Sequence, residues 1–236
     1  MRESQPALMD ALSECRFAVE RYARRIRHSG SGRRMAAQIL KSPVPKLQIG
    51  CGKNLHTGWL NADISASENS FYLDATRPLP FPDASFAYVF SEHMIEHIPV
   101  RKGIKLLEEI FRVLRPNGRV RIATPDLKFL IDLYDEPKTG LQRRYIEFAA
   151  KNFLPGLPPT AVYVINNTVR DWGHQFIYDR ATLRGILKSV GFVDVVDCKV
   201  MVSQYPELCG LESHGHTVIG EEFNELETMV IEGRKP

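Results

Sequence analysis

Two glycines and two aspartates lie at the ends of apolar runs, where backbone amides and carboxylates could bind one ligand together. The run from Lys46 to Gly52 reads K-L-Q-I-G-C-G, an apolar stretch that stops at two glycines flanking a small residue. Glycine adopts positive φ at little cost and leaves backbone N–H groups accessible as donors. Asp63 ends the next apolar stretch, and Asp74 ends the one after it. Since parallel strands end at one edge of a doubly wound sheet, we expect these groups to share one crevice.

A second pattern whose residues could carry out chemistry lies just beyond the apolar run Phe86 to Ser91. Residues 93–97 read H-M-I-E-H, which matches the H-x-x-E-H motif of some zinc peptidases. On a helix, histidines four residues apart face the same side and can bind one zinc ion. Pro99 stops such a helix within one turn, and a third ligand is required.

The third zinc ligand would have to come from a later polar segment, at Glu212, His214 or His216. We therefore predict no metal site. A zinc hydrolase that uses His93, Glu96 and His97 is kept as an alternative, which metal analysis of the purified protein would test.

The composition is that of one globular domain with an extension. The chain has 236 residues, of which 44% are hydrophobic and 25% are charged. No apolar run approaches the roughly 18 residues of a membrane span, and the N-terminus lacks the apolar core of a signal peptide. The four cysteines are scattered without a C-x-x-C pair, which favours a reduced, cytoplasmic setting.

Residues 1–45 are interpreted as a basic helical extension. They hold nine Lys/Arg and four Asp/Glu, and apolar residues recur at helical spacing between Ala7 and Arg27. The favoured interpretation is a covering helix that packs on the domain or, in a homodimer, on a second subunit. Docking onto an anionic membrane surface or a phosphate-rich acceptor is the alternative. A nucleic-acid partner is not favoured, because the basic charge does not continue across the rest of the chain.

The body of the chain alternates short apolar runs with helical stretches, the pattern of βαβ units. A helix is expected from Arg101 to Leu114, and the turn R-P-N-G ends it. Thr124 is the expected cap of a further helix, and Asp179 caps another that Gly191 ends. Three more strands are expected at Arg119–Ala123, Phe192–Val202 and Thr228–Glu232.

Residues 137–173 interrupt this rhythm with seven prolines and glycines and several aromatic residues. A long insertion of this kind beyond a sheet edge is more often a functional cover than an idle loop. We predict an inserted lid that covers the substrate, with a structural or oligomer-contact insertion as the alternative.

Five motifs then occur in a recognisable order. They are L-Q-I-G-C-G, G-W-L-N-A-D, D-A-T-R-P-L-P-F-P-D-A-S-F, S-E-H-M-I-E-H-I and E-I-F-R-V-L-R-P-N-G-R-V-R-I-A-T-P-D. Together they resemble class I S-adenosylmethionine-dependent methyltransferases, and most closely the small-molecule branch similar to the ubiquinone-biosynthesis enzymes. The resemblance implies an α/β, Rossmann-like, doubly wound and mostly parallel seven-stranded sheet over residues 46–236. It also implies S-adenosyl-L-methionine as cofactor and a small-molecule or glycan-like methyl acceptor.

The resemblance further implies which residues bind the cofactor. Asp63 would accept hydrogen bonds from the ribose hydroxyls, and Asp74 with the Ala75 backbone would meet the adenine. The methionine part would lie against the strand ends, at Ile49, Gly50, Cys51, Gly52 and Ser91. For an alcohol acceptor a general base is useful, and His93 and His174 are the candidate catalytic residues. A structural hydrogen-bonding role is the competing interpretation for both.

Three features depart from the family pattern. Gln48 stands near the position of an acid that often holds the cofactor ammonium. The third glycine is replaced, since Lys53 and Asn54 follow Gly52, and the interval from Gly50 to Asp63 is too short for a crossover helix. The first departure is the best support for an alternative, a binding module without turnover. A nicotinamide oxidoreductase is a further alternative, but Leu55 stands where the last glycine of G-x-G-x-x-G belongs.

Overall fold

The computed structural model describes residues 30–236. The helix predicted between Ala7 and Arg27 lies outside these residues. Residues 30–40 are helical and lead into the first strand of the sheet. No helix among the described residues is both long and apolar enough to cross a membrane.

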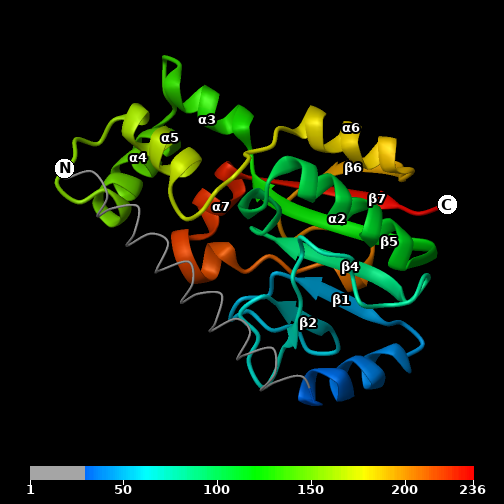
Figure 1. The fold of residues 1–236 in the computed structure, drawn as a ribbon. Helices are drawn as coiled ribbons and strands as arrows, with labels where there is room; N and C mark the ends of the chain where they lie inside the picture. The colour runs from blue at the N-terminus through cyan, green and yellow to red at the C-terminus, as the bar shows by residue number, and fades with distance from the viewer. Residues whose placement is uncertain (1–29) are drawn as a thin grey trace, which may run out of the picture.

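A seven-stranded sheet in the order β3-β2-β1-β4-β5-β7-β6 forms the centre of the molecule (Figure 1). The strands are β1 (Lys46–Ile49), β2 (Leu60–Asp63), β3 (Phe71–Tyr72), β4 (Phe86–Glu92), β5 (Leu114–Pro125), β6 (Val193–Cys198) and β7 (Thr228–Arg234). Only β7 among them runs antiparallel to its neighbours β5 and β6, and the remaining pairs are parallel. The predicted Rossmann-like, mostly parallel sheet is confirmed.

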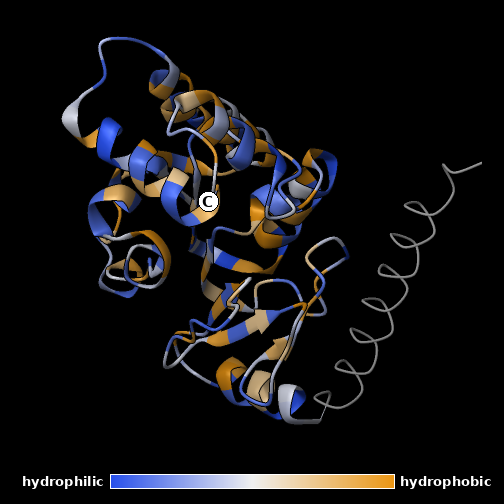
Figure 2. Ribbon diagram, turned by 90° about the vertical axis from the view of Figure 1, so that its left-hand side faces the viewer, coloured by the Kyte–Doolittle hydropathy of each residue, from blue (hydrophilic) through white to orange (hydrophobic). Residues whose placement is uncertain are grey.

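The helices are α2 (Val100–Val113), α3 (Leu127–Tyr134), α4 (Gly140–Phe153), α5 (Ala161–Arg170), α6 (Arg180–Val190) and α7 (Glu221–Glu227), with short helices η1 (Ile95–His97), η2 (Pro206–Leu208) and η3 (Gly215–Ile219). Strands β1 to β4 follow one another without an α-helix between them, and helices α3 to α6 are consecutive between β5 and β6. Figure 2 shows hydrophobic stretches along the strands and a mixture of hydrophobic and hydrophilic residues on the helices. Each amphipathic helix buries its apolar side against the sheet or a neighbouring helix.

The two largest of the four apolar clusters in the described residues are a main core and a smaller one. The main core lies between the sheet and helices α2 and α6, and includes Leu47, Val89, Leu107 and Leu187. A second cluster joins α3, α4, α5 and α7 beyond one end of the strands. Residues 137–173 therefore form two helices that share a core with α3 and α7, and their role as a lid stays a prediction.

Several boundaries differ from the expected ones. β5 begins at Leu114 instead of Arg119, and the turn at Asn117 (φ 63°) lies inside it as an irregularity of the pairing with β4. The helix after β5 is capped by Asp126, whose side chain accepts from the Lys128 amide, so Thr124 as the cap was wrong. The cap at Asp179 and the stop at Gly191 (φ 117°) are confirmed.

A buried ionic cluster connects the sheet to the chain that follows β6. Arg121 on β5 is 0% exposed and lies between two carboxylates, at 2.6 Å from Glu212 and 2.6 Å from Glu232. Its guanidinium also donates to the carbonyls of Lys199 and Val202, at 3.1 Å each. All four acceptors are thus positioned by one buried charge.

Replacing Arg121 with methionine is expected to destabilise the protein by about 3–5 kcal/mol, because two buried carboxylates lose their counter-charge. Urea unfolding followed by circular dichroism measures the change. The matched control is Arg119→Met on the same strand, whose guanidinium stacks 3.7 Å from the centre of the Tyr205 ring and contributes about 0.5–1 kcal/mol. Equal losses for the two variants would contradict the account of the cluster.

Candidate active site

The glycine turn after β1 has the backbone conformation that the sequence predicts. Gly50 and Gly52 have positive φ, 78° and 50°. The amides of Gly50 and Cys51 donate to the Ala62 carbonyl at 2.8 and 3.1 Å, which fixes the turn against β2. A Cβ on Gly52 would meet no atom within 4 Å, so this side of the turn is open to a ligand.

Asp63, the last residue of β2, lies directly beside this turn. Its Oδ2 accepts from the Gly52 amide at 2.9 Å, and its Oδ1 accepts from the Ser65 amide at 2.6 Å. A carboxylate can accept about four hydrogen bonds, so lone pairs remain for ligand hydroxyls. Burial, helped by the charge of Asp63, raises the pKa of the Cys51 thiol to about 12, which keeps this thiol neutral.

Asp74 and Ala75 follow β3, the strand at the outer edge of the sheet. The Asp74 carboxylate accepts from the Thr76 hydroxyl at 2.6 Å and pairs with Arg77 at 3.1 Å. Arg77 has a side chain that is 73% exposed, and ion pairs in solvent contribute little. Asp74 can therefore exchange this partner for a ligand at small cost.

Ser91 and Gln48 carry buried polar atoms that lack a partner. Ser91 pairs with Ile49 in the register of β4 and β1, is 1% exposed, and its hydroxyl makes no hydrogen bond. The Oε1 atom of Gln48, which is 2% exposed, is also unpaired. Such atoms cost about 1–3 kcal/mol each when unsatisfied. A polar ligand at this edge would satisfy them, so the residues present fit the predicted cofactor.

A cavity of about 190 Å³ opens beyond the carboxyl ends of β4 and β5. Its polar lining is unusually rich in imidazole and carboxylate: His93, Glu96, His97, His174, His214 and Glu227. Aromatic residues of the insertion, Tyr145, Phe153 and Trp172, form part of its wall. Both candidate catalytic histidines thus line one cavity, whereas the eight predicted cofactor-binding residues do not line it.

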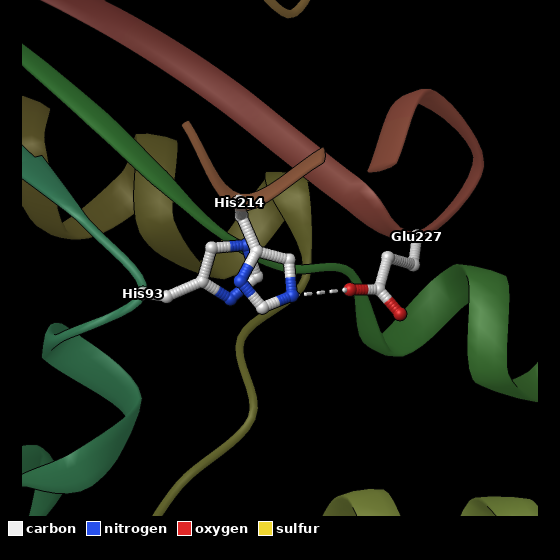
Figure 3. Close-up of side chains that lie close together, drawn as sticks. All are labelled: His93, His214 and Glu227. Atoms are coloured by element: carbon white, nitrogen blue, oxygen red, sulfur yellow. Dashed lines mark ion pairs between the residues drawn. The ribbon is translucent and has the colours of Figure 1, made fainter. Parts of the chain in front are cut away.

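His93, His214 and Glu227 form the first polar cluster of this cavity (Figure 3). The two imidazole rings are stacked, with centroids 3.9 Å apart and planes at 19°. His214 Nε2 lies 3.3 Å from Glu227 Oε1, and the other oxygen of Glu227 accepts a hydrogen bond from the Tyr145 hydroxyl. Burial, together with the charge of Glu227, raises the pKa of Tyr145 well above its usual value, so this hydroxyl stays a donor.

The tautomer of His93 follows from its hydrogen bonds. The Thr228 hydroxyl donates to Asn224 Oδ1 at 2.8 Å, so it accepts from His93 Nε2–H at 3.1 Å. His93 Nδ1 is then the nitrogen left to bind a proton, and it lies 3.4 Å from Glu96 Oε1. Burial lowers the pKa of His93, but the adjacent Glu96 carboxylate outweighs burial and raises it on balance.

The position of His214 depends on Glu92, the last residue of β4. The Glu92 carboxylate accepts from the Ser213 amide at 2.8 Å and from the His214 amide at 2.9 Å. The neighbouring Glu212 is held by Arg121. Two charged groups of the sheet therefore fix the segment that places His214 over His93.

Glu96, His97 and His174 form the second polar cluster. Glu96 is 0% exposed, and its Oε2 accepts from the Thr124 hydroxyl at 3.0 Å. His174 Nδ1 bonds to the Thr168 carbonyl oxygen, an acceptor, so Nδ1 carries the proton. The His97 and His174 rings are 4.7 Å apart. Burial is the main cause that lowers the pKa of His97.

The H-x-x-E-H pattern does not act as one motif in the structure. Its helical part is the single turn η1, as the position of Pro99 predicts. His93 has φ 43° and turns toward His214, whereas His97 lies with His174, so the two histidines belong to different clusters. Nothing in the local sequence of Glu227, Thr228 and Tyr145 distinguishes them from ordinary helix and strand residues, so their place at the cavity was not predicted.

Residues 47–122 match the family described as "Methyltransferase domain". They run from β1 into β5 and include the glycine turn, Asp63, Asp74 and His93. This part of the chain is therefore similar to methyltransferase domains. The match supports the predicted resemblance to methyltransferases. The similarity to the ubiquinone-biosynthesis branch stays a prediction.

Solved structures similar to this chain are distant in sequence. A SAM-dependent methyltransferase from Archaeoglobus fulgidus shares 18% identity over 91% of this chain and 99% of that one, with a TM-score of 0.48. A SAM-dependent methyltransferase from Thermotoga maritima shares 17% identity over 86% and 87%, with a TM-score of 0.46. Phosphoethanolamine N-methyltransferase 2 from Haemonchus contortus, in complex with S-adenosyl-L-methionine, shares 16% identity over 81% of this chain, with a TM-score of 0.43.

The alignment spans about half, 48%, of the length of that Haemonchus protein. A search of curated protein sequences found no significant match.

In the glycine turn after β1, Gly50→Ala is expected to destabilise more than Gly52→Ala. Both positions have positive φ, which costs a non-glycine residue about 1–2 kcal/mol. A Cβ on Gly50 would in addition lie 2.4 Å from Met94 Cγ, whereas a Cβ on Gly52 meets open space. Thermal unfolding of the two variants measures the difference. An equal loss of melting temperature would show that Met94 does not pack against this turn.

Proposed function

We propose that the domain transfers the methyl group of S-adenosylmethionine to a small-molecule or glycan-like acceptor that binds in the histidine-lined cavity. One observation carries this proposal: Ser91, at the predicted cofactor edge, and His93, in the cavity wall, are two residues apart at the end of β4. A cofactor held at this strand end would present its methyl group toward the cavity.

The cofactor would be held by the ends of β1 to β4. Asp63 would accept the ribose hydroxyls, Asp74 and the Ala75 backbone would take the adenine, and the methionine part would lie along the glycine turn and Ser91. When bound, S-adenosylmethionine supplies an electrophilic methyl group on a positively charged sulfur. The protein then has to place the acceptor about 3 Å from this methyl group and in line with the leaving sulfur.

His93 is the proposed general base for an acceptor hydroxyl. Its Nε2–H is held by Thr228, and its Nδ1 carries the lone pair. This is the arrangement of a base oriented by a second group. His174, the other candidate, has its free nitrogen beside Glu96 and His97.

The size of the cavity supports a small acceptor. Its volume of about 190 Å³ is below the roughly 300–1,000 Å³ of pockets that enclose drug-sized ligands. Tyr145, Phe153 and Trp172 come from residues 137–173, which supports the proposal that this insertion covers the acceptor. From the sequence we also propose a cytoplasmic location and a homodimer that forms through the N-terminal helix.

Asp63→Ala is expected to weaken S-adenosylmethionine binding by about 10- to 100-fold, since charge-assisted hydrogen bonds contribute about 1.5–3 kcal/mol. Isothermal calorimetry with S-adenosylhomocysteine measures the affinity. Asp83→Ala, at a side chain that is 79% exposed, is the control and should leave it unchanged. Unchanged affinity in Asp63→Ala would refute the proposed cofactor site.

His93→Asn is expected to lower methyl transfer by about 100- to 10,000-fold without changing cofactor affinity. Asparagine tolerates the positive φ of this position, so the backbone is preserved. The measurement is transfer of labelled methyl from S-adenosylmethionine to a small-metabolite fraction. His216→Asn is the control, because His216 is exposed and outside the cavity. Turnover in His93→Asn equal to that of the control would exclude His93 as the base.

A further inference from the structure

We propose that Glu96, His97 and His174 bind one divalent metal ion of the zinc type in the wall of the acceptor cavity. This differs from the expectation of no metal site, and it differs from the H-x-x-E-H grouping because His93 is not among the ligands. The proposal goes beyond methyl transfer as such, and the role given to the ion below rests on the proposed function.

The three side chains have the composition and spacing of an open metal site. One ligand atom from each lies within 4.8 Å of the others. Two imidazoles and one carboxylate are a set found in catalytic zinc sites, where a fourth position stays open to water or substrate. Ligands of a tetrahedral zinc ion lie about 3.3 Å apart, so small side-chain rotations close the site. All three residues line the cavity, which supplies the open position.

The Glu96 carboxylate is the strongest indication that something is bound. Its side chain is 0% exposed, and its Oε1 makes no hydrogen bond. The only ion-pair partner described for this oxygen is His93 Nδ1 at 3.4 Å, beyond good hydrogen-bond range. A buried carboxylate oxygen whose only such contact is this long one is costly. A metal ion would satisfy it.

The outer partners of Glu96 and His174 are those expected around a bound metal. Metal-bound histidines usually donate their second ring N–H to a carbonyl or carboxylate, which fixes the coordinating nitrogen. His174 does this through Nδ1 to the Thr168 carbonyl. The second oxygen of Glu96 is held by the Thr124 hydroxyl.

The backbone also fixes the two segments that carry the ligands. The amides of Gln175 and Phe176 donate to the Glu96 carbonyl at 2.7 and 3.2 Å. His174 is therefore attached beside Glu96 through the main chain as well as through the cavity wall. A site built on such cross-linked segments is largely organised before the ion binds.

The cluster of His93, His214 and Glu227 is a poorer metal site. Its two imidazoles are stacked face to face, at 19° and 3.9 Å, so their in-plane lone pairs run nearly parallel and cannot converge on one ion. Both oxygens of Glu227 already have partners, His214 and Tyr145. This cluster suits proton transfer, whereas the Glu96 cluster suits a cation.

An ion at this site would bind an oxygen of the acceptor, and metal coordination makes such an oxygen easier to deprotonate. The acceptor class would then be a hydroxyl or enol compound. In the transfer, the bond between this oxygen and the methyl carbon forms while the carbon–sulfur bond breaks. The hydroxyl proton goes to His93, and the sulfonium becomes the neutral thioether S-adenosylhomocysteine.

Metal binding by the full-length chain tests the proposal. Protein stripped with a chelator is dialysed against Zn²⁺, and the bound metal is measured by mass spectrometry, with Co²⁺ substitution and its visible spectrum as a report on coordination. We expect one ion per chain in the wild type and in His216→Asn. We expect more than a tenfold loss of affinity in Glu96→Gln, His97→Asn and His174→Asn. Thr124→Val, which removes an outer partner, should weaken binding by about 10- to 100-fold.

His97 is the most exposed of the three ligands, so His97→Asn should keep its fold even where substitution of the buried Glu96 does not. Absence of bound Zn²⁺ in the wild type would overturn the proposal, and so would binding that is insensitive to all three substitutions. Loss of the ion in His214→Asn but not in His174→Asn would assign it to the other cluster and also overturn it. Calorimetry with S-adenosylhomocysteine on the same samples separates this outcome from a failure of the proposed function, because the cofactor site contains none of the three ligands.

Discussion

The buried charge of Arg121 is the constraint on which the active-site region depends. Its guanidinium lies without solvent contact between Glu212 and Glu232 and holds two carbonyls of the chain that follows β6. Moving any of these groups would leave a charge unpaired in a low-dielectric interior, which is strongly unfavourable. The segment that begins at Glu212 therefore has one position, and Glu92 fixes it from the other side at Ser213 and His214. For this reason the imidazole of His214 is held against that of His93.

The end of β4 connects the two halves of the proposed chemistry. Ser91 faces the glycine turn through its pairing with Ile49, Glu92 fixes the His214 segment, and His93 turns into the cavity with a positive φ. Three consecutive residues thus supply, in this order, the edge of the cofactor site, the anchor of the His214 segment in the cavity wall, and the acid–base group. Non-glycine residues with positive φ are uncommon and occur often at functional sites. The strain at His93 is consistent with a role that depends on where its ring points.

The sequence predicts the framework well because its signals are local. Apolar runs that end in glycine or aspartate locate β1 and β2, and the short interval between Gly50 and Asp63 is confirmed by two parallel strands with no helix between them. The boundary of β5 was missed, since pairing with β4 and β7 extends the strand through a turn sequence. Tertiary contacts override local turn preference at that point.

The grouping of the cavity residues could not be predicted in the same way. The sequence singled out His93, Glu96, His97 and His174, but it treated the first three as one helical motif. The structure separates them because His93 adopts positive φ and η1 is only one turn long. Glu227 joins His214 through packing between α7 and η3, which leaves no periodic trace in the sequence.

A crystal structure of the full-length chain with S-adenosylhomocysteine tests the central claim most directly. The account predicts that the ribose hydroxyls bind the Asp63 carboxylate and that the thioether sulfur faces the mouth of the cavity at His93. A nucleoside bound away from Asp63, or a sulfur directed away from the cavity, would contradict it.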